Sequence, residues 1–496
     1  MKKVIIFGLI ISIGYSVTSC NKKLDQQPIV SIIDTAFWKT KEDAKAANLS
    51  LYAGLQNVFS NTFTEWGDAR SDNLSYGGTG ENQVNISLNG LDAVTAAADW
   101  GGIYNEILRA NLNIKYMPKI FNNRQISQSE LNHYLAQAYT ARAFMYFWAV
   151  RLWAKQNSED KYGIPVRLSP YETLDSNQYI KRTNAKYVFD SVILPDLKNA
   201  LTLVDASQKS TLFINQGAIL SLLAEVYLWN KDYINALATT NQIVALKRYS
   251  IVQDPSLYKD VFVSATTAEN IWSLDWHFAT DGRNGLGTKL GSSGNTSNYY
   301  IDTSTAWYKN WIISPDTRRY LTYDTSIYSR TSQPKQIWKF YPIDINTGKP
   351  VIPTRIQCEA KLPFFRYADI LLMQAEAANA LGDTATALAN VRTIRNRSSA
   401  GPIKAIAYNN LASPNDVLKV ILDERQIELY CEGKRWFDLV RNDLVIPIMD
   451  PLVKSRQNTL SLSPTGFSDY HKILWPVSRA VLIANTLIDQ NENYAR

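Results

Sequence analysis

Apolar side chains recur with helical spacing in seven long blocks of the chain, and stretches without regular spacing separate them. The blocks span residues 35–59, 99–117, 128–155, 185–203, 216–246, 366–396 and 415–441. A recurrence at every third or fourth position is typical of helices that bury one face. The sequence therefore predicts a mainly α-helical protein.

Two of these blocks, 216–246 and 366–396, share a register of small and apolar residues. The shared positions are Ala224, Tyr227, Asp232, Ala236 and Leu237, which recur 151 residues later as Ala375, Ala378, Asp383, Ala387 and Leu388. Small residues let two antiparallel helices approach closely, and turn residues lie midway through each block. The spacing resembles tetratricopeptide repeats, although the Trp-Leu-Gly start is missing. We expect two further helix pairs, 35–59 with 99–117 and 128–155 with 185–203.

The stretch 250–363 breaks the helical pattern. It contains five glycines between positions 282 and 294, many Ser and Thr residues, and scattered aromatic residues. Residues 336–341 and 351–358 flank Asn346-Thr347-Gly348, which predicts a β-hairpin. We expect a lobe of loops and short strands here, and the stretch 60–91 has the same loop character.

The amino-terminal segment has the features of an export signal. Lys2 and Lys3 precede an apolar run over residues 4–17, which is too short to cross a bilayer, and the small residues Val17-Thr18-Ser19 lead directly to Cys20. This predicts a lipoprotein signal peptide, residues 1–19, that is cleaved to leave a lipidated Cys20. An ordinary secretory signal is the alternative, but it would not need a cysteine at that position. No later segment has the length and hydropathy of a membrane span.

Composition argues against several classes of function. The net charge is +7, or +5 without Lys2 and Lys3, and no dense basic block suggests nucleic acid. Apart from Cys20, the cysteines are Cys358 and Cys431, which are either disulfide-bonded or two buried thiols. With only three histidines, no zinc-type spacing exists, so we predict no metal and no cofactor. The 13 Trp and 28 Tyr residues instead suggest a recognition surface.

No catalytic set can be nominated from the sequence. The run 285–291 imitates a dinucleotide fingerprint, but its third glycine is one residue late and no strand-to-helix transition frames it. Gly-x-Ser-x-Gly does not occur, and the three histidines stand in unrelated contexts. Paired acids for sugar hydrolysis are harder to exclude, because two such carboxylates can come from anywhere in the chain.

The segment 424–441 is the densest cluster of charged and aromatic residues. A catalytic interpretation would use Glu428, Glu432 or Asp438 as acid or base. The interpretation that we favour is an internal ion-pair lattice. In it, Arg425, Arg435 and Arg441 hold the last helices together.

Several motifs, in their order and spacing, make the chain resemble the SusD/RagB family of Bacteroidetes outer-membrane lipoproteins. The stretches that carry the resemblance are Cys20 with Leu24, Asp25 and Pro28; Trp100 to Ile114; Arg366 to Ala377; Glu424 to Leu439; and the closing Leu474-Trp475-Pro476. Its motif residues include Arg366, Glu376, Arg425, Glu428, Glu432, Gly433, Arg435, Trp436 and Asp438. The likeness covers nearly the whole chain, so we expect one domain over 20–496, with 250–363 as an inserted lobe.

The resemblance implies a scaffold of four tetratricopeptide-like units and a binding protein without enzymatic activity. Such proteins bind nutrients, usually glycans and sometimes peptides, and pass them to a SusC-like TonB-dependent transporter at the outer membrane. We therefore expect a lipid-anchored protein at the cell surface. The segment Asn21-Lys22-Lys23 after Cys20 lacks the acidic run often linked to surface export, so the sequence leaves open which face of the membrane the anchor occupies.

A glycan site needs aromatic rings that stack on sugar C–H faces, with directed polar groups beside them. Two loops fit this description, and their candidate ligand-binding residues are Trp66, Arg70, Asp72, Asn73 and Tyr76 in one and Trp276, Asn298, Tyr299, Tyr300, Trp307 and Trp311 in the other. Since Trp is highly buried on average, about half of these should lie in the core. The alternative functions are a surface glycoside hydrolase, a peptide-binding protein and an interaction scaffold.

Overall fold

The computed structural model describes residues 37–76, 81–156, 158–171, 179–281, 285–290, 299–322, 337–341, 359–398, 413–467, 470–492 and 494–495. The predicted signal segment with Cys20, the candidate Asn298, and the turn and second strand of the expected hairpin, 342–358, lie outside these residues.

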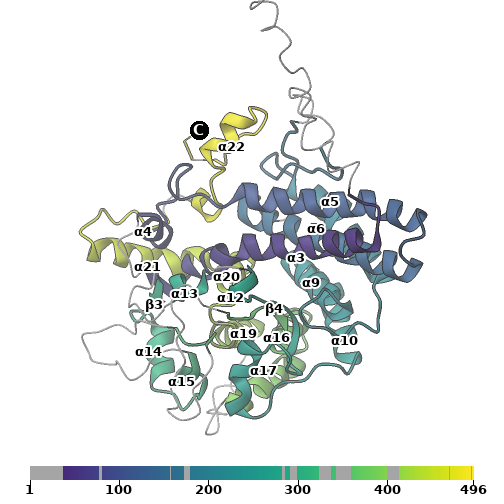
Figure 1. Ribbon diagram of the computed structural model, residues 1–496. Coiled ribbons are helices and arrows are strands. Elements are labelled where there is room, and N and C mark those ends of the chain that lie inside the picture. Colours follow the sequence, from purple (N-terminus) through teal and green to yellow (C-terminus); the bar gives the residue numbers. More distant parts are fainter. Residues whose placement is uncertain are drawn as a thin grey trace, which may run out of the picture.

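Four antiparallel helix pairs form the body of the molecule (Figure 1). The pairs are α3 (Lys41–Thr64) with α5 (Trp100–Asn122), α6 (Gln128–Trp153) with α8 (Leu194–Leu203), α9 (Gln216–Trp229) with α10 (Tyr233–Ala245), and α16 (Tyr367–Ala380) with α17 (Thr384–Ser398). Contacts of α5 with α6, α8 with α9 and α10 with α16 join successive pairs into one array. The predicted mainly helical, tetratricopeptide-like scaffold is confirmed.

In the two blocks that share a register, 216–246 and 366–396, turn residues end the first helix. Between α9 and α10, Lys231 adopts a φ of 58° and the Asp232 side chain caps α10 by accepting a hydrogen bond from the Asn235 N–H. Between α16 and α17, Gly382 has a φ of 89°, a conformation that glycine adopts without a steric penalty. The blocks 216–246 and 366–396 are therefore each two helices joined by a tight turn.

Helix α6 lies at the centre of the core. Its amino terminus carries a capping box, in which Ser127 and Glu130 bond reciprocally to each other's backbone N–H. From residue 140 to residue 153 every side chain is buried, and α6 packs against α5, α8, α3 and α9. The aromatic stripe with Phe144, Phe147 and Trp148 is thus core packing.

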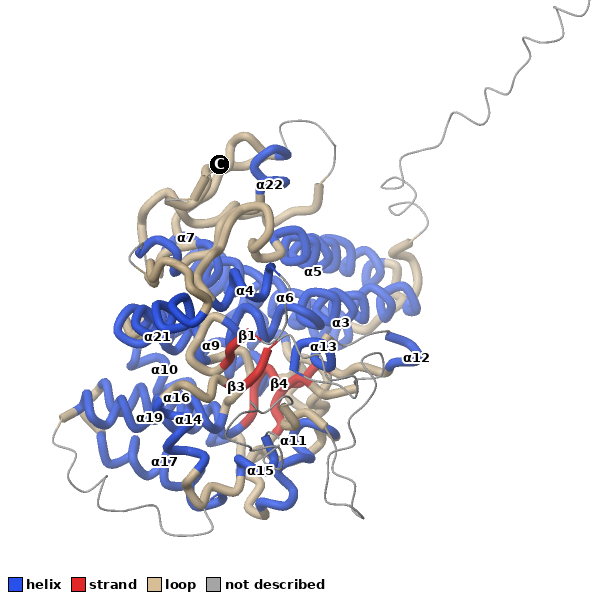
Figure 2. Tube along the Cα trace, turned by 90° about the vertical axis from the view of Figure 1, so that its left-hand side faces the viewer, coloured by secondary structure: helices blue, strands red, loops and turns tan. Residues whose placement is uncertain are grey.

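The remaining elements are two short strand pairs and further helices outside the four helix pairs. The strands form two antiparallel pairs, β1 (Leu74–Tyr76) with β3 (Tyr299–Ile301) and β2 (Asn270–Leu274) with β4 (Leu362–Arg366), which lie near the middle of the molecule (Figure 2). The other helices are α4 (Glu81–Ser87), α7 (Ala185–Val188), α11 (Asp260–Val263), α12 (Phe278–Asp281), α13 (Leu286–Leu290), α14 (Ala306–Ile312), α15 (Arg318–Thr322), α19 (Pro414–Glu428), α20 (Arg435–Arg441), α21 (Val445–Thr459) and α22 (Arg479–Ala484). Single turns of other helical types are η2 (Glu65–Ala69), η4 (Phe189–Ile193), η5 (Pro255–Lys259) and η6 (Tyr470–Ile473).

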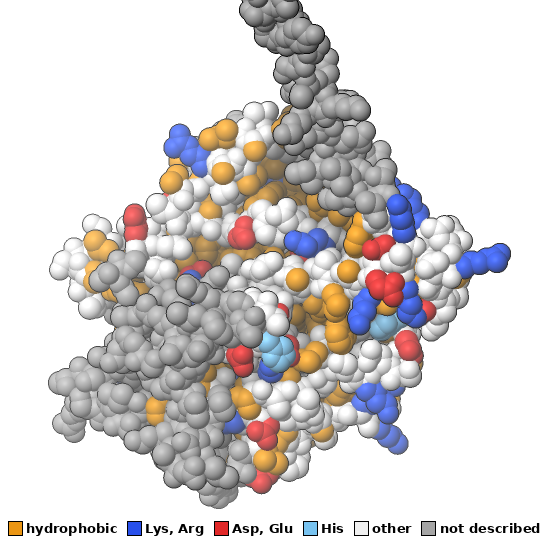
Figure 3. Space-filling model, viewed as in Figure 1, with side chains coloured by type: hydrophobic (Ala, Val, Ile, Leu, Met, Phe, Trp, Pro, Cys, Tyr) orange, Lys and Arg blue, Asp and Glu red, His pale blue; other side chains and the backbone are white. Residues whose placement is uncertain are grey.

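The described parts of 250–363 contain β2, β3 and several of these short helices, while its role as an inserted lobe stays a prediction. On the face shown in Figure 3, the described Lys and Arg side chains are interspersed with Asp and Glu and do not gather into one basic patch. Among the described residues, no helix combines the length and the hydropathy needed to cross a membrane.

Helix α5 buries an acidic side chain, Glu106, against α3. Its carboxylate comes so close to Gly54 that a Cβ at that position would lie 1.5 Å from Oε2. Within the described part of the chain neither carboxylate oxygen accepts a hydrogen bond, and the Arg109 Nε is 3.5 Å away. Burial raises the pKa of Glu106 well above its ordinary value, against the smaller effect of Arg109.

We expect Glu106→Gln to gain stability relative to the wild type as the pH rises above about 4.5, the ordinary pKa of the carboxyl group. Because the folded-state pKa is raised, the stability from this group is complete below about pH 4.5 and is lost as pH rises toward the folded value. Gln does not ionise, so the variant should gain on the order of 1 kcal/mol over the wild type between pH 5 and pH 8. Urea unfolding at both pH values measures this difference. The exposed Glu42→Gln should show no such gain, and an equal gain in both variants would contradict the assignment.

Candidate ligand-binding site

Three segments that are far apart in the sequence meet beside the β1–β3 pair. They are the loop from η2 to β1, the connection from β3 to α14, and the link between α19 and α20. The Asp302 N–H donates to the Asn73 carbonyl at 3.0 Å, and the Gly433 N–H donates to Asp68 Oδ2 at 2.7 Å. Both loops that supplied the sequence candidates are therefore part of one assembly.

Trp307, on α14, is the best-oriented candidate that keeps part of its side chain exposed. Its indole N–H donates to the Asp72 carbonyl at 2.8 Å. Its ring centroid lies 5.7 Å from that of Trp311 and 5.7 Å from that of Tyr430. The hydrogen bond and the two rings fix the indole, so that a half-exposed aromatic surface is held in one orientation.

The backbone that orients Trp307 is itself held by a buried ion pair. Arg435 donates two hydrogen bonds to the Asp72 carboxylate, at 2.8 and 2.9 Å, and Gln426 donates a third at 2.9 Å. Burial alone would raise the pKa of Asp72, but the Arg435 guanidinium outweighs it and lowers that pKa below its ordinary value. Asp72 therefore acts as a fixed anion under the aromatic surface.

The neighbouring polar side chains are also saturated by internal partners. The Asn73 amide donates to Asp68 Oδ1 at 2.9 Å and accepts from Gln426 at 3.0 Å. Asp68 is fully enclosed, and burial raises its pKa to about 7 despite the donors Asn73 and Gly433. These groups position the loop and leave no polar atom for a ligand.

The two half-exposed tyrosines of the β1–β3 pair, Tyr76 and Tyr300, do not share a face. The register sets Tyr76 opposite Tyr299 and Tyr300 opposite Ser75. Cross-strand partners share a face and successive residues alternate, so Tyr300 and Ser75 lie on one face and Tyr76 lies with buried Tyr299 on the other. The expected aromatic surface is therefore reduced to Trp307 and one tyrosine.

Seven of the eleven candidate ligand residues are buried, somewhat more than the half that we expect from the sequence. They are Trp66, Arg70, Asp72, Asn73, Trp276, Tyr299 and Trp311, while Tyr76, Tyr300 and Trp307 are half-exposed and Asn298 lies outside the described residues. A ring with 1% of its surface exposed cannot stack on a sugar.

The buried candidates have structural partners instead. Trp66 packs on Trp148, and Tyr299 donates a hydrogen bond to Glu65 at 3.1 Å. The Arg70 guanidinium lies 4.0 Å from the Trp436 ring centroid and donates to a backbone carbonyl of the closing segment at 2.8 Å. These contacts explain why these three candidates are buried.

Behind this assembly, the family motifs meet in a buried ion-pair lattice centred on Glu428. Arg366 contacts Glu428 at 2.5 Å and Glu432 at 2.7 Å, and Arg318 contacts Glu428 at 2.6 Å. Arg397 makes a third contact with Glu428. Burial would raise the pKa of Glu428, but the three arginines lower it well below its ordinary value.

A second part of the lattice links α16, α19 and α20. Arg425 contacts Asp369 and Asp438, both at 2.9 Å, and Arg441 contacts Asp438 at 2.6 Å and Glu376 at 2.5 Å. Burial opposes ionisation of Asp438, yet the two arginines lower its pKa to about 2. The three acids of the catalytic interpretation, Glu428, Glu432 and Asp438, are buried and paired with arginines, so the ion-pair lattice that we favour describes this segment.

Some members of the assembly were not found from the sequence. Glu269, Arg318 and Arg397 belong to the lattice but lie outside the motifs that the sequence analysis identifies. Tyr430, whose ring packs against Trp307 at an interplanar angle of 48°, has no sequence signal beyond its place in the charged segment. The one available signal was an isolated charge beside an apolar strand, as for Glu269 before Asn270–Leu274.

The described residues include no group of three or more His, Cys, Asp or Glu side chains placed to hold a metal ion. Cys431 is a buried free thiol. Cys358, with which the sequence allows a disulfide bond, lies outside the described residues.

Comparison with known protein families gives two matches. A family model described as "SusD family" matches residues 305–494, and a related SusD-like model described as "Starch-binding associating with outer membrane" matches residues 24–228. Among curated relatives, SusD-like protein P38 of Formosa agariphila is 27% identical over 99% of this chain and 98% of its own. SusD-like protein P2 of the same organism is 25% identical over 95% and 96%.

Solved structures share the fold. A SusD superfamily protein from Bacteroides thetaiotaomicron superposes with a TM-score of 0.73 at 20% identity, covering 92% of this chain and 100% of its own. A SusD superfamily protein from Bacteroides vulgatus gives a TM-score of 0.73 at 19% identity with the same coverage.

Proposed function

The chain belongs to the SusD/RagB family, and on this premise we propose that it is a lipid-anchored glycan-binding protein that delivers its ligand to a SusC-like TonB-dependent transporter. The observation that carries the binding proposal is Trp307, a half-exposed indole fixed by the Asp72 carbonyl and two aromatic rings. The family description of residues 24–228 as starch-binding supports the same ligand class.

A fixed indole suits a sugar better than a mobile one. The C–H face of a pyranose ring stacks on the aromatic face, and the contact costs less entropy when the ring is already immobilised. Trp307 uses its N–H internally, so its contribution to a ligand is the ring face alone. We propose that Tyr300 or Tyr76 and polar groups of the adjoining segments complete the site.

We propose binding without hydrolysis. A glycosidase needs two carboxyl groups that face each other across the sugar, with one able to give up a proton. Among the described residues, the acids of this assembly are buried. Asp72 is paired with Arg435 and Asp302 with Arg456, while Asp68, whose pKa burial raises to about 7, is enclosed and accepts hydrogen bonds from Asn73 and Gly433. None of the three is exposed to a ligand on the indole.

The outer-membrane part of the proposal rests on the sequence and the family. Cys20 would carry the lipid, and the family model for residues 24–228 is described as associating with the outer membrane. We propose that the helix-pair array faces the transporter. A peptide ligand or a pure scaffold role remains the second candidate, because an aromatic surface also accepts aromatic side chains.

We expect Trp307→Ala to weaken glycan binding at least about tenfold, since loss of one stacking contact worth about 1.4 kcal/mol has that effect. Affinity electrophoresis against a panel of polysaccharides identifies the ligand, and calorimetry then measures Kd. The matched control is Tyr187→Ala, which removes a ring that is 48% exposed on α7 and should change Kd less than twofold.

Three other results would contradict the proposed glycan site or the proposed function. Binding by Trp307→Ala at wild-type affinity would place the site elsewhere. Release of reducing ends would contradict the binding proposal in favour of a hydrolase. A panel without any retarded migration, combined with binding of defined peptides, would favour the peptide candidate.

A further inference from the structure

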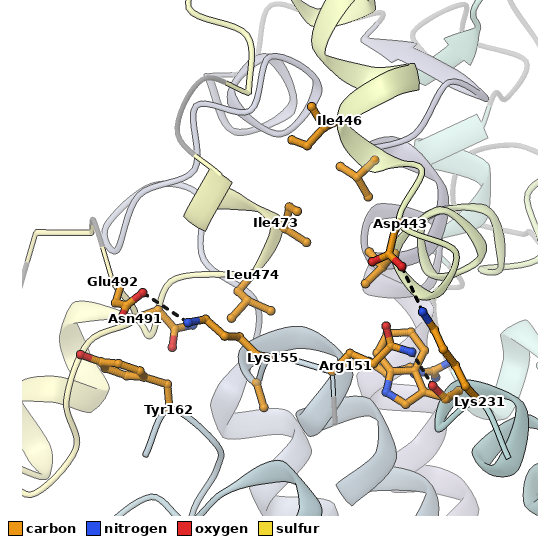
Figure 4. Close-up of a pocket in the computed structure, with 15 residues that line it drawn as sticks. Arg151, Lys155, Tyr162, Lys231, Asp443, Ile446, Ile473, Leu474, Asn491 and Glu492 are labelled. Atoms are coloured by element: carbon orange, nitrogen blue, oxygen red, sulfur yellow. Dashed lines mark hydrogen bonds and ion pairs between the residues drawn. The ribbon is translucent and has the colours of Figure 1, made fainter. Parts of the chain in front are cut away.

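A concave site lies among residues that the proposed glycan site does not use. It is a cavity of about 560 Å³ between the carboxyl-terminal ends of α6 and α9, the start of α21 and the closing segment of the chain (Figure 4). This volume is within the range of small-molecule sites. None of the candidate glycan residues lines it.

The walls of this cavity are mainly apolar. Val440 and Ile446 line one side, Ile473 and Leu474 line the other, and all four are half-exposed. Tyr162 adds a half-exposed aromatic ring. A sugar carries hydroxyl groups all round and would leave most of them without partners here, so these walls favour a ligand with an apolar body.

Two ion pairs flank the apolar walls on opposite sides, as Figure 4 shows. Lys155 is 3.4 Å from Glu492 and 3.5 Å from Asp160, and Lys231 is 3.0 Å from Asp443. Each of these side chains has at least 32% of its surface exposed, and such pairs contribute little stability. An anionic group on a ligand can therefore compete for either lysine at small cost.

The part of the wall formed by Arg151 and Trp229 has a positive charge and hydrogen-bond donors that are not used by any described residue. Among the described residues, neither Arg151 Nε–H nor Trp229 Nε1–H has an acceptor, whereas no buried side-chain acceptor of the lining lacks a donor. Glu225 is shared between Arg151, at 3.1 Å, and Lys434, at 3.2 Å. Burial lowers the pKa of Arg151 to about 10 even with Glu225 beside it. Its guanidinium carbon also lies 4.1, 4.2 and 4.3 Å from the ring centroids of Phe147, Trp148 and Phe437.

From the volume, the apolar walls and the surplus of cations and donors, we propose that this cavity binds a small carboxylic acid with an apolar body. The hydrocarbon part packs against Ile446 and Leu474, and the carboxylate pairs with Lys155 or Lys231. This site is separate from the proposed glycan site and does not depend on it.

The test uses decanoate as the probe and isothermal titration of the folded protein. We expect saturable one-to-one binding, and decylamine, a cation of the same length, should bind at least tenfold more weakly. Ile446→Asp should weaken decanoate binding at least tenfold, while Ser455→Asp, an exposed position on the same helix, should leave it unchanged.

The double variant Lys155→Gln with Lys231→Gln alters only exposed side chains and should weaken decanoate binding fivefold or more. A decanoate Kd of the wild type weaker than about 1 mM, equal binding of decylamine, or equal loss in Ser455→Asp would overturn the proposal. Trp307→Ala should bind decanoate normally, so failure at this cavity and failure of the glycan proposal give different results.

Discussion

Glu428→Gln is expected to lower the free energy of unfolding by about 3–5 kcal/mol, the usual effect of removing one partner from a buried ion pair. The wild-type carboxylate is contacted by Arg318, Arg366 and Arg397, and none of the four side chains has more than 3% of its surface exposed. The amide is nearly the same size but carries no charge. The three guanidinium groups would therefore have one carboxylate fewer to pair with, and they have no access to water. Urea unfolding at neutral pH measures the loss.

The matched control lies on the same helix. Asp423 pairs with Lys419 on α19, with 49% and 74% of the two side chains exposed. Asp423→Asn makes the same chemical change in a solvated pair and should cost less than about 1 kcal/mol. If both variants lost the same stability, the lattice would not be the reason.

The lattice also bears on the proposed glycan site. Lys339 donates from its ammonium to the carbonyls of Glu428 and Tyr430, at 2.8 and 3.0 Å, and the Tyr430 ring packs on Trp307. The charged core thus holds the backbone that supports the aromatic surface. We expect glycan binding by Glu428→Gln to fall only where the variant unfolds, because no atom of Glu428 reaches the surface.

The helical scaffold was predictable because its signals are local. The apolar blocks at 128–155 and 216–246 correspond to α6 and to α9 with α10, and the turn at Asn230–Asp232 lies where the repeat register placed it. Spacing along one helix depends on neighbours three or four residues away. Pairing of adjacent helices then follows from short connections and small residues.

The candidate site was less predictable because burial there depends on distant partners. Asp72 looks like a loop carboxylate in the sequence, yet its ion-pair partner Arg435 is 363 residues away. Arg70 is enclosed in the same manner by aromatic rings at positions 436 and 475. No local pattern distinguishes such residues from ligand-binding ones, since both kinds are polar or aromatic residues in irregular segments.

A glycine pair between η2 and the α19–α20 link gives the second large expected effect. A Cβ added at Gly67 would lie 2.3 Å from the Cα, C and O atoms of Gly433. Gly433 cannot move aside easily, because its N–H bonds to Asp68 at 2.7 Å and its φ of 72° places it in a left-handed conformation against Phe63. We therefore expect Gly67→Ala to lower the free energy of unfolding by about 3 kcal/mol or more, the upper end for overpacking.

The control for Gly67→Ala is Gly101→Ala, in the first turn of α5. There the nearest atom to an added Cβ is Asp99 Oδ1 at 3.6 Å, an ordinary contact, so the helix should gain up to about 1 kcal/mol. Urea midpoints of the two variants should move in opposite directions.

Phe63→Ala should not rescue Gly67→Ala, because the obstacle is the backbone of Gly433 and not a side chain. A Gly67→Ala protein within about 1 kcal/mol of the wild type would show that the two segments can separate, and the rigid support inferred for Trp307 would then be wrong.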